Sequence, residues 1–313
     1  MLLIDGLRKR FGEVQALDGL SFTVKPGELF GFLGANGAGK TTTMRIVLGL
    51  MRADEGAVTW DGRATHDWQR RTWGYMPEER GLYLRMPVVE QLVHFASLYG
   101  VPRATARRNA REWLARFRIA DAADRRAEQL SNGNQQKVQY IATILHDPDV
   151  LVMDEPFAGL DPVNVALLKA AFVEMRDRGK TILFSTHQLE QAEELCDSVA
   201  IIDHGRIVTT GTTREVKRST GHQVVRVATG GDGDLDWLRS MPHVTVTRDG
   251  QDYAEVRVDT GTDPQSVLRE AMTHGGVLRF EVADPSLEEV FVERVGALDV
   301  KERTLAAAPG SRS

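Results

Sequence analysis

The chain has 313 residues, of which 42% are hydrophobic and 27% are charged, the usual balance of a globular protein. This length allows one large domain, or one domain with a smaller second one. The formal net charge of -5 gives the chain as a whole no electrostatic reason to bind nucleic acid or acidic lipid.

Cysteine content and hydropathy indicate where the protein works. The single cysteine, Cys196, excludes an intramolecular disulfide framework and is typical of a reducing cytosol. No stretch of about 18 consecutive apolar residues occurs, so we expect no membrane-spanning helix. The opening MLLIDGLRKRFG places charges directly after a very short apolar run, which is the wrong order for a signal peptide. We therefore expect a cytoplasmic protein unless a partner holds it elsewhere.

The first 50 residues predict paired strands that lead into a phosphate-binding loop. LLIDGLRKRFG and ALDGLSFTVKPGE alternate apolar and polar residues, which predicts antiparallel strands with a turn at Pro26-Gly27. ELFGFLG then predicts a buried strand, and KTTTMRIVLGL predicts a helix. Between them lies GANGAGKTT, residues 34–42, which matches the pattern G-x-x-x-x-G-K-[ST] through Gly34, Gly39, Lys40 and Thr41.

This loop has the chemistry of a nucleotide phosphate site. Glycines let backbone N–H groups approach phosphates closely, and the helix N-terminus adds partial positive charge. We expect Lys40 to contact the β- and γ-phosphates and the Thr41 hydroxyl to ligate Mg²⁺. A turn that matches by chance is the alternative, which the strand before the loop and the helix after it disfavour. The expected nucleotide contacts of the loop are Gly34, Asn36, Gly37, Ala38, Gly39, Lys40, Thr41 and Thr42.

The stretch VLVMDE predicts the other half of the site. Four apolar residues indicate a buried strand, and Asp154 and Glu155 follow at its carboxyl end, where α/β sheets bind ligands. Asp154 would hold Mg²⁺, as in other P-loop nucleotide hydrolases. Glu155 would then act as general base on a water in line with the γ-phosphate. Two solvated carboxylates at the start of a loop are the alternative, which the phosphate loop makes weaker.

The rest of the chain predicts a helical insert, a return to α/β structure and a second domain. From Val88 to about Pro148 the apolar spacing is helical, with helices expected in VVEQLVHFASLYG, ATARRNAREWLARFRIA and NQQKVQYIATILHD. Alternating strands and helices follow, up to a hairpin that turns at His204-Gly205. KRSTGHQ, near residue 220, reads as a linker. The order βαββαβ with a further helix comes after it and predicts a ferredoxin-like fold.

In this order, the motifs resemble those of the ABC-type ATPases over roughly residues 2–215. The phosphate loop would be the Walker A motif and VLVMDE the Walker B motif. LSNGNQQK, residues 130–137, stands in the place of the family signature LSGGQ. The remaining matches are AGLDP with the D-loop through Asp161, STHQLEQAEELCD with the switch region through His187, and Phe11 where the family stacks an aromatic ring on adenine.

The resemblance implies the fold and the domain limits. We expect an α/β fold, a P-loop NTPase core of the ABC type with an antiparallel β subdomain and a helical subdomain over about 86–148. This ATPase domain would cover residues 1–218. A small α+β, ferredoxin-like domain would cover residues 222–298, and a disordered tail residues 299–313, because that segment is small and polar.

The resemblance also implies a mechanism with ATP and Mg²⁺ as cofactors. A second ATPase subunit, the same chain or a related one, would close head to tail on the first around two ATP molecules. Ser131 and Gly133 of one subunit would contact the γ-phosphate bound at Lys40 of the other. His187 would hydrogen-bond the γ-phosphate beside Glu155. A Ser–Gly segment at a helix N-terminus also suits an anion on physical grounds.

Two departures from the family pattern bear on the site. Asn132 replaces a signature glycine and Asn134 replaces the glutamine, while Ser131 and Gly133 are retained, so we expect hydrolysis to persist. In GYMPEERGLY, Glu78 stands where the family usually has glutamine, in the loop that senses the metal. Its carboxylate could ligate Mg²⁺ or point away from it.

The helical insert also contains a basic segment. A nucleic-acid face is one interpretation, but the negative net charge and the apolar stripe opposite favour a solvated helix face and no nucleic-acid partner. Trp113 and Phe117 read as core residues. The arginines concerned are Arg107, Arg108, Arg111, Arg116 and Arg118.

Three classes of ABC ATPase compete: a transporter subunit, a ribosome-acting ATPase and a DNA-repair or chromosome-organising ATPase. Ribosomal members usually have two ATPase domains in one chain, and only one motif set occurs here. Repair members insert a long coiled coil, whereas Lys40 and Ser131 are roughly 90 residues apart without sustained heptads. The transporter class is therefore favoured. The stretches GYMPEERGLY, LSNGNQQKVQ and DPSLEEVFVERV resemble ATPases of bacterial drug, sodium and lipid-type exporters, which work at the cytoplasmic face of the membrane on a separate integral permease.

Overall fold

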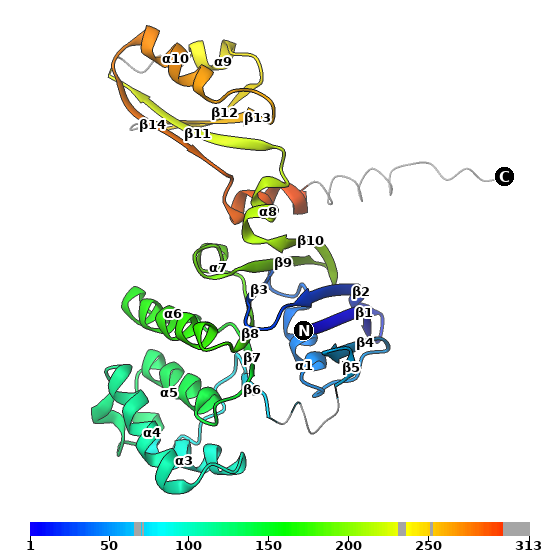
Figure 1. Cartoon of the computed structure of the whole chain (residues 1–313), viewed down its shortest axis with the longest axis vertical. Coiled ribbons are helices and arrows are strands. Elements are labelled where there is room, and N and C mark those ends of the chain that lie inside the picture. Colours follow the sequence, from blue (N-terminus) through cyan, green and yellow to red (C-terminus); the bar gives the residue numbers. More distant parts are fainter. Residues whose placement is uncertain (66–69, 71, 231–235, 251–252, 297–313) are drawn as a thin grey trace, which may run out of the picture. The chain divides into compact units, whose positions relative to one another are not determined.

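A computed structural model describes residues 1–65, 70, 72–230, 236–250 and 253–296 (Figure 1). The chain divides into two compact units, residues 1–210 and 211–313. The expected tail, residues 299–313, lies outside the described residues.

The first unit is built on two sheets. An antiparallel sheet has the order β2-β1-β4-β5, and a six-stranded sheet has the order β10-β9-β3-β8-β7-β6. In the larger sheet β3 is parallel to β8 and β9, and β7 is parallel to β6 and β8. The strands are β1 (Leu2–Phe11), β2 (Val14–Val24), β3 (Leu29–Leu33), β4 (Glu55–Trp60), β5 (Arg63–Ala64), β6 (Gly74–Met76), β7 (Val150–Asp154), β8 (Thr181–Thr186), β9 (Ser198–Asp203) and β10 (Arg206–Thr212).

Helices α3, α4 and α5 pack on one another, as the helical spacing between residues 88 and 148 predicts (Figure 1). Helix α1 starts at Lys40, directly after the glycine loop, and α6 and α7 each connect two strands of the larger sheet. The helices of this unit are α1 (Lys40–Val47), α3 (Val88–Leu98), α4 (Arg103–Arg116), α5 (Asn132–Ile144), α6 (Pro162–Asp177) and α7 (Leu189–Leu195). Short 3₁₀ turns cover Ala120–Ala122 and Ala127–Gln129.

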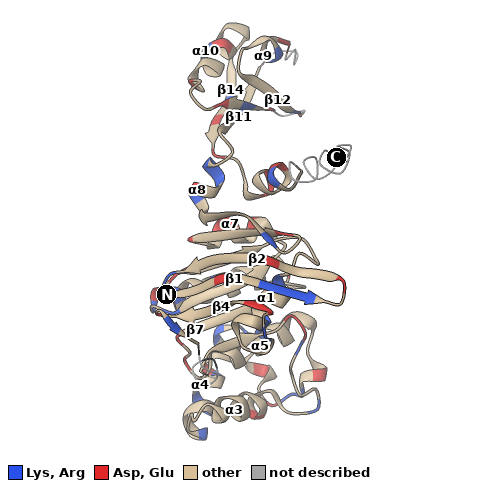
Figure 2. Ribbon diagram, turned by 90° about the vertical axis from the view of Figure 1, so that its right-hand side faces the viewer, with Lys and Arg blue, Asp and Glu red and all other residues tan. Residues whose placement is uncertain are grey.

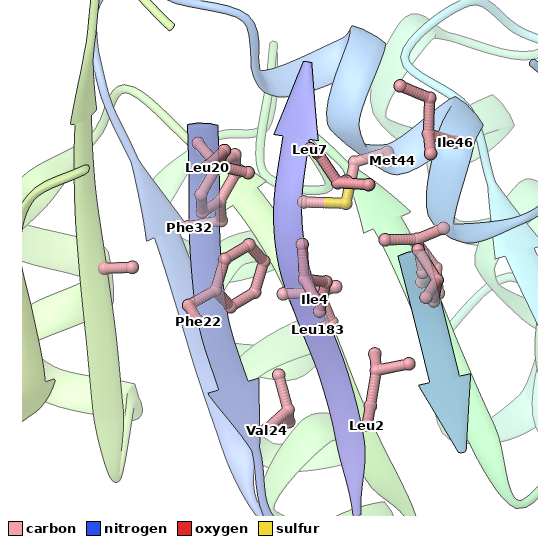
Figure 3. Packing of buried hydrophobic residues seen from close by; sticks show 14 of the residues in the cluster. Leu2, Ile4, Leu7, Leu20, Phe22, Val24, Phe32, Met44, Ile46 and Leu183 are labelled. Atoms are coloured by element: carbon pink, nitrogen blue, oxygen red, sulfur yellow. The ribbon is translucent and has the colours of Figure 1, made fainter. Parts of the chain in front are cut away.

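The main core of this unit lies between the two sheets and α1 (Figure 3). In β1, Leu2 and Ile4 point inward by alternation, and an irregularity between Ile4 and Leu7 turns Leu7 inward as well. Phe22 of β2 stacks on Phe32 of β3, with ring centroids 5.0 Å apart. Because β3 and β7 are buried along their whole length, the residues that end these strands are held in fixed positions.

The basic segment of α4 forms ion pairs. Arg107 lies 2.8 Å from a Glu90 carboxylate oxygen, and Arg111 lies 3.3 Å from Asp124. Arg116 pairs with Glu174 and covers the Trp113 ring, while Phe117 is buried. Lysines and arginines are interspersed with acidic residues over the first unit (Figure 2). This arrangement supports the interpretation of a solvated helix face.

The second unit begins with α8 (Thr213–Arg218) and has a four-stranded antiparallel sheet of order β12-β13-β11-β14. The order of elements confirms the predicted βαββαβ, ferredoxin-like fold. Its elements are β11 (His222–Thr229), α9 (Asp236–Ser240), β12 (Val244–Asp249), β13 (Ala254–Asp259), α10 (Gln265–His274) and β14 (Val277–Ala283), followed by helical residues 287–296. Val225, Val256 and Leu238 lie at the centre of its core.

Candidate active site

The loop between β3 and α1 depends on glycine at two positions. Gly39, the N-cap of α1, has a φ of 109°, and a Cβ there would lie 2.8 Å from the Ala16 carbonyl oxygen. A Cβ on Gly34 would lie 2.4 Å from the carbonyl oxygen of Ile202. Side chains at these positions would push the loop away from the strands beneath it. The loop is therefore held in one conformation, with the start of α1 open above it.

Lys40 is the best-anchored side chain of the loop. It is 6% exposed, and its Nζ donates to the carbonyl oxygens of Gly34 at 2.8 Å and Ala35 at 3.1 Å. The same ammonium lies 3.5 Å from Glu155 Oε1. Its positive charge is thus fixed between the loop and the end of β7.

The two predicted carboxylates emerge where β7 ends and are held by the neighbouring strand β8. Ser185 Oγ donates to Asp154 Oδ1, and Thr186 Oγ1 donates to Glu155 Oε2 at 3.1 Å. His187 Nδ1, directly after β8, lies 2.9 Å from Glu155 Oε1. Ser185 and Thr186 were missed by the sequence analysis, although they lie in the stretch STH that ends a predicted strand.

The backbone at Glu155 is unusual. Its φ of 48° lies in the left-handed region, and its N–H donates to the Ser185 carbonyl oxygen at 3.0 Å. For a residue other than glycine, this conformation costs about 1–3 kcal/mol and persists where the surroundings enforce it. Such residues concentrate at functional sites, so the outlier supports a role for Glu155 beyond folding.

A cavity of about 260 Å³ joins the loop to the carboxylates. Gly34 and Ala38 do not line it, and Ala38 is buried. Ala16, from β2, lines it although sequence analysis did not single it out. Glu78, from the segment after β6, also lines it. The lining residues are Ala16, Asn36, Gly37, Gly39, Lys40, Thr41, Thr42, Glu78, Asp154 and Glu155.

The residues around Asp154 fit a Mg²⁺ ion that is completed by substrate. Asp154 is 1% exposed, and its Oδ2 is buried without a hydrogen bond from any described residue. Thr41 and Glu78 line the same cavity. Magnesium usually takes one or two carboxylates together with waters and phosphate oxygens. Accordingly, no group of three His, Cys, Asp or Glu in the described ranges is placed to hold a metal alone.

Besides Gly34 and Ala38, the predicted nucleotide contacts that do not line this cavity are Phe11, Ser131, Gly133 and Asp161. Phe11 ends β1 and is 46% exposed. Ser131 caps α5 and accepts from the Asn134 N–H at 3.4 Å.

Gly133 and Asp161 lie close together through Asn164. A Cβ on Gly133 would lie 3.4 Å from Asn164 Nδ2, and that amide donates to Asp161 Oδ2 at 2.5 Å. The Asn164 N–H also donates to Asp161 Oδ1, which lowers the pKa of this carboxyl group below its usual value. The signature segment and the D-loop therefore form a second polar cluster, separate from the cavity at Lys40.

A glycine loop that opens a helix, with carboxylates at the end of another parallel strand of the same sheet, defines the class of P-loop nucleotide hydrolases. Family models narrow this class. A model described as "ABC transporter" matches residues 17–158, and one described as "ATP-binding protein DrrA1-3-like, C-terminal domain" matches residues 211–295.

Similar proteins align with nearly the whole length of this chain. The uncharacterized ABC transporter ATP-binding protein YhaQ of Bacillus subtilis is 42% identical, covering 95% of this chain and 99% of its own. The Nod factor export ATP-binding protein I of Ralstonia nicotianae is 37% identical, covering 95% and 94%. The daunorubicin/doxorubicin resistance ATP-binding protein DrrA of Streptomyces peucetius is 35% identical, covering 93% and 91%.

Among solved structures, an ATP-binding subunit of an ABC transporter superposes with a TM-score of 0.65 at 33% identity, covering 71% of this chain and 93% of that one. The chain belongs to the ABC transporter ATP-binding proteins. It is an ATPase of that family, the subunit of a transporter that binds and hydrolyses ATP.

Proposed function

We propose that this ATPase powers export through a separate integral membrane permease, by closing on a second ATPase subunit when ATP binds and opening after hydrolysis. The observation that carries the proposal is the separation of the two polar clusters. Lys40 lines the cavity, whereas Ser131, Gly133 and Asp161 do not. If two chains form two ATP sites and each chain supplies one half of each site, the presence of both clusters in one chain is explained.

Within one site, the described geometry suits water attack on the γ-phosphate. Thr186 fixes one oxygen of Glu155, and Lys40 and His187 lie beside the other. Glu155 would take the proton of the attacking water, and His187 would orient the γ-phosphate. Lys40 would balance the phosphate charge. Asp154 and Thr41, with Glu78 beside them, would hold Mg²⁺, which supplies further charge neutralisation when bound.

The first unit offers a surface for the permease. Two cavities, of about 140 Å³ and 410 Å³, share Tyr75 and Tyr99 in their linings. Leu50 and Tyr99 in these linings are exposed, and so is Tyr83, whose ring stacks on Phe95 of the smaller cavity. Within the described part of the chain, no helix is both long and apolar enough to cross a membrane. We propose that a helix of the permease packs here and holds the ATPase at the cytoplasmic face.

Export is supported by the printed names of similar proteins, which include Nod factor export and drug resistance ATP-binding proteins. A fluoroquinolones export ATP-binding protein of Mycobacterium tuberculosis is also 33% identical over 302 residues.

The shared site is tested with Glu155→Gln, which removes the base but keeps the side-chain shape. We expect turnover to fall by at least about a hundredfold. We also expect an ATP-dependent dimer, measured by light scattering after size exclusion. Ser131→Arg should abolish this dimer. When Glu155→Gln and Ser131→Arg chains are mixed, a dimer of one with the other should contain at most one competent site. Wild-type turnover in Glu155→Gln, or a dimer that Ser131→Arg leaves intact, would contradict the proposal.

The permease surface is tested by co-purification from membranes that contain the cognate permease. Tyr99→Glu should lose the permease, because a charge in an apolar contact must be desolvated. Leu278→Glu, at an apolar position of the second unit that is more exposed than Tyr99, is the control. Equal recovery of both variants would place the permease elsewhere.

A further inference from the structure

Helix α5 has a polar stripe that the proposed mechanism does not use. Asn132, Gln135, Gln139 and Thr143 follow one another at intervals of three or four residues, so they share one face of the helix. All four bond to the segment 75–80, which leads from β6 past Glu78. This stripe connects the helix of the signature segment to a wall of the cavity.

The C-terminal part of the stripe is buried, and its side-chain donors bond to the segment 75–80. Thr143 Oγ1 donates to the Tyr75 carbonyl oxygen at 3.2 Å. Gln139 Nε2 donates to the carbonyl oxygens of Pro77 at 2.7 Å and Glu79 at 3.3 Å. Gln139 and Thr143 are each 4% exposed. Breaking these bonds would leave buried polar groups without partners, so the segment follows α5 as one body.

At the N-terminal end of the stripe, one guanidinium group bonds to two side chains of α5. Arg80 Nη1 donates to Asn132 Oδ1 at 2.7 Å and to Gln135 Oε1 at 3.3 Å. Gln135 is itself fixed, because its Nε2 donates to the carbonyl oxygens of Ala127 and Leu130. Arg80 and Asn132 are exposed, so this link contributes little to folding stability. It lies directly beside Ser131 and Gly133.

We propose that Arg80 is a positioning residue that ties the signature segment 131–134 to the loop of Glu78, with Asn132 as its acceptor. Glu78 lines the cavity at Lys40, and Arg80 is two residues further along the same loop. A shift of this loop when nucleotide enters would therefore reach Ser131 and Gly133 through the Arg80–Asn132 bond. A glycine in place of Asn132 would have no side-chain oxygen to accept it. The link gives this departure from the signature a physical role.

The first test needs no dimer. Amide hydrogen exchange of the full chain, without nucleotide, should be roughly tenfold faster over residues 131–135 in Arg80→Ala than in the wild type. The buried end of α5, near Thr143, should not change. Asn132→Asp retains an oxygen acceptor and should keep slow exchange. Arg85→Ala, at an exposed position between this segment and α3, is the matched control. Unchanged exchange over 131–135 in Arg80→Ala would overturn the proposal.

The second test rests on the proposed function, because it uses the shared sites. ATPase rates across ATP concentration should show a loss of about tenfold in kcat for Arg80→Ala and for Asn132→Ala, the usual effect of losing a hydrogen bond from a charged donor. The Hill coefficient should fall toward unity, an effect that altered folding alone does not predict. Arg80→Ala/Asn132→Ala should lose no more than the worse single variant, and Asn132→Asp should restore activity. Additive losses would refute a shared interaction.

The two proposals fail in distinguishable ways. Suppose that Glu155→Gln forms its ATP-dependent dimer, while Arg80→Ala changes neither amide hydrogen exchange nor ATPase kinetics. The positioning role is then refuted and the shared site stands. If exchange responds to Arg80→Ala but no dimer forms, the link within one subunit stands and the shared site is refuted.

Discussion

Removing one hydroxyl, in Ser185→Ala, tests how the structure prepares Asp154 for a metal. Asp154 is 1% exposed, and Ser185 Oγ donates to its Oδ1, while Oδ2 accepts no hydrogen bond from the described residues. A hydrogen bond to a charged group contributes about 1.5–3 kcal/mol, so we expect the free energy of unfolding without nucleotide to fall by that amount. Loss of a group that orients a metal ligand typically costs about 10–100-fold in metal affinity. The Mg²⁺ concentration for half-maximal ATPase activity should rise accordingly.

The chain offers a matched control in Ser198→Ala. Ser198 Oγ also donates to a buried carboxylate, that of Glu28, outside the cavity. Urea unfolding should show similar destabilisation in both variants, whereas only Ser185→Ala should shift the Mg²⁺ titration. Equal titrations of the two variants would refute the reasoning, because the hydroxyl would then matter for folding alone.

Three further predictions concern single charges. Lys40→Ala should weaken ATP binding at least about tenfold, because a buried ammonium is lost from the cavity; equal affinity by calorimetry would contradict this. Glu78→Gln should raise the Mg²⁺ requirement several-fold, since a negative charge is removed beside the ion, and an unchanged requirement would place this side chain away from the metal. Burial against Tyr99 lowers the pKa of His146 below its usual 6.5. The unfolded chain therefore takes up this proton first as the pH falls, so stability is full above about pH 6.5 and is lost below it, by at most about 1.4 kcal/mol per pH unit. His146→Gln should remove this part of the pH dependence in urea unfolding; an identical slope would exclude His146 as its source.

The contiguous parts of the site were predictable from the sequence. Residues 34–42 and the pair Asp154 and Glu155 can be recognised in the sequence because each follows a buried strand. The carboxyl ends of such strands are where α/β sheets bind ligands. Their meeting in one cavity follows from a sheet in which β8 lies between β3 and β7.

Other parts depend on contacts between distant segments. Ser185 and Thr186 matter only because β8 pairs with β7, and Ala16 only because β2 passes beside the loop. Strands β4 and β5 were missed because most of their residues are exposed and the apolar signal is weak. Asn132 was visible as a departure from the signature, but its partner Arg80 lies 52 positions away in the chain.

The left-handed backbone at Glu155 has a consequence for how this protein can be altered. Glycine and asparagine adopt that conformation more readily than glutamate. A library screened only for thermal resistance or expression would therefore favour exchanging this glutamate, and would enrich well-folded chains that cannot turn over ATP. Laboratory evolution toward a more robust protein needs a selection for activity to keep position 155 intact.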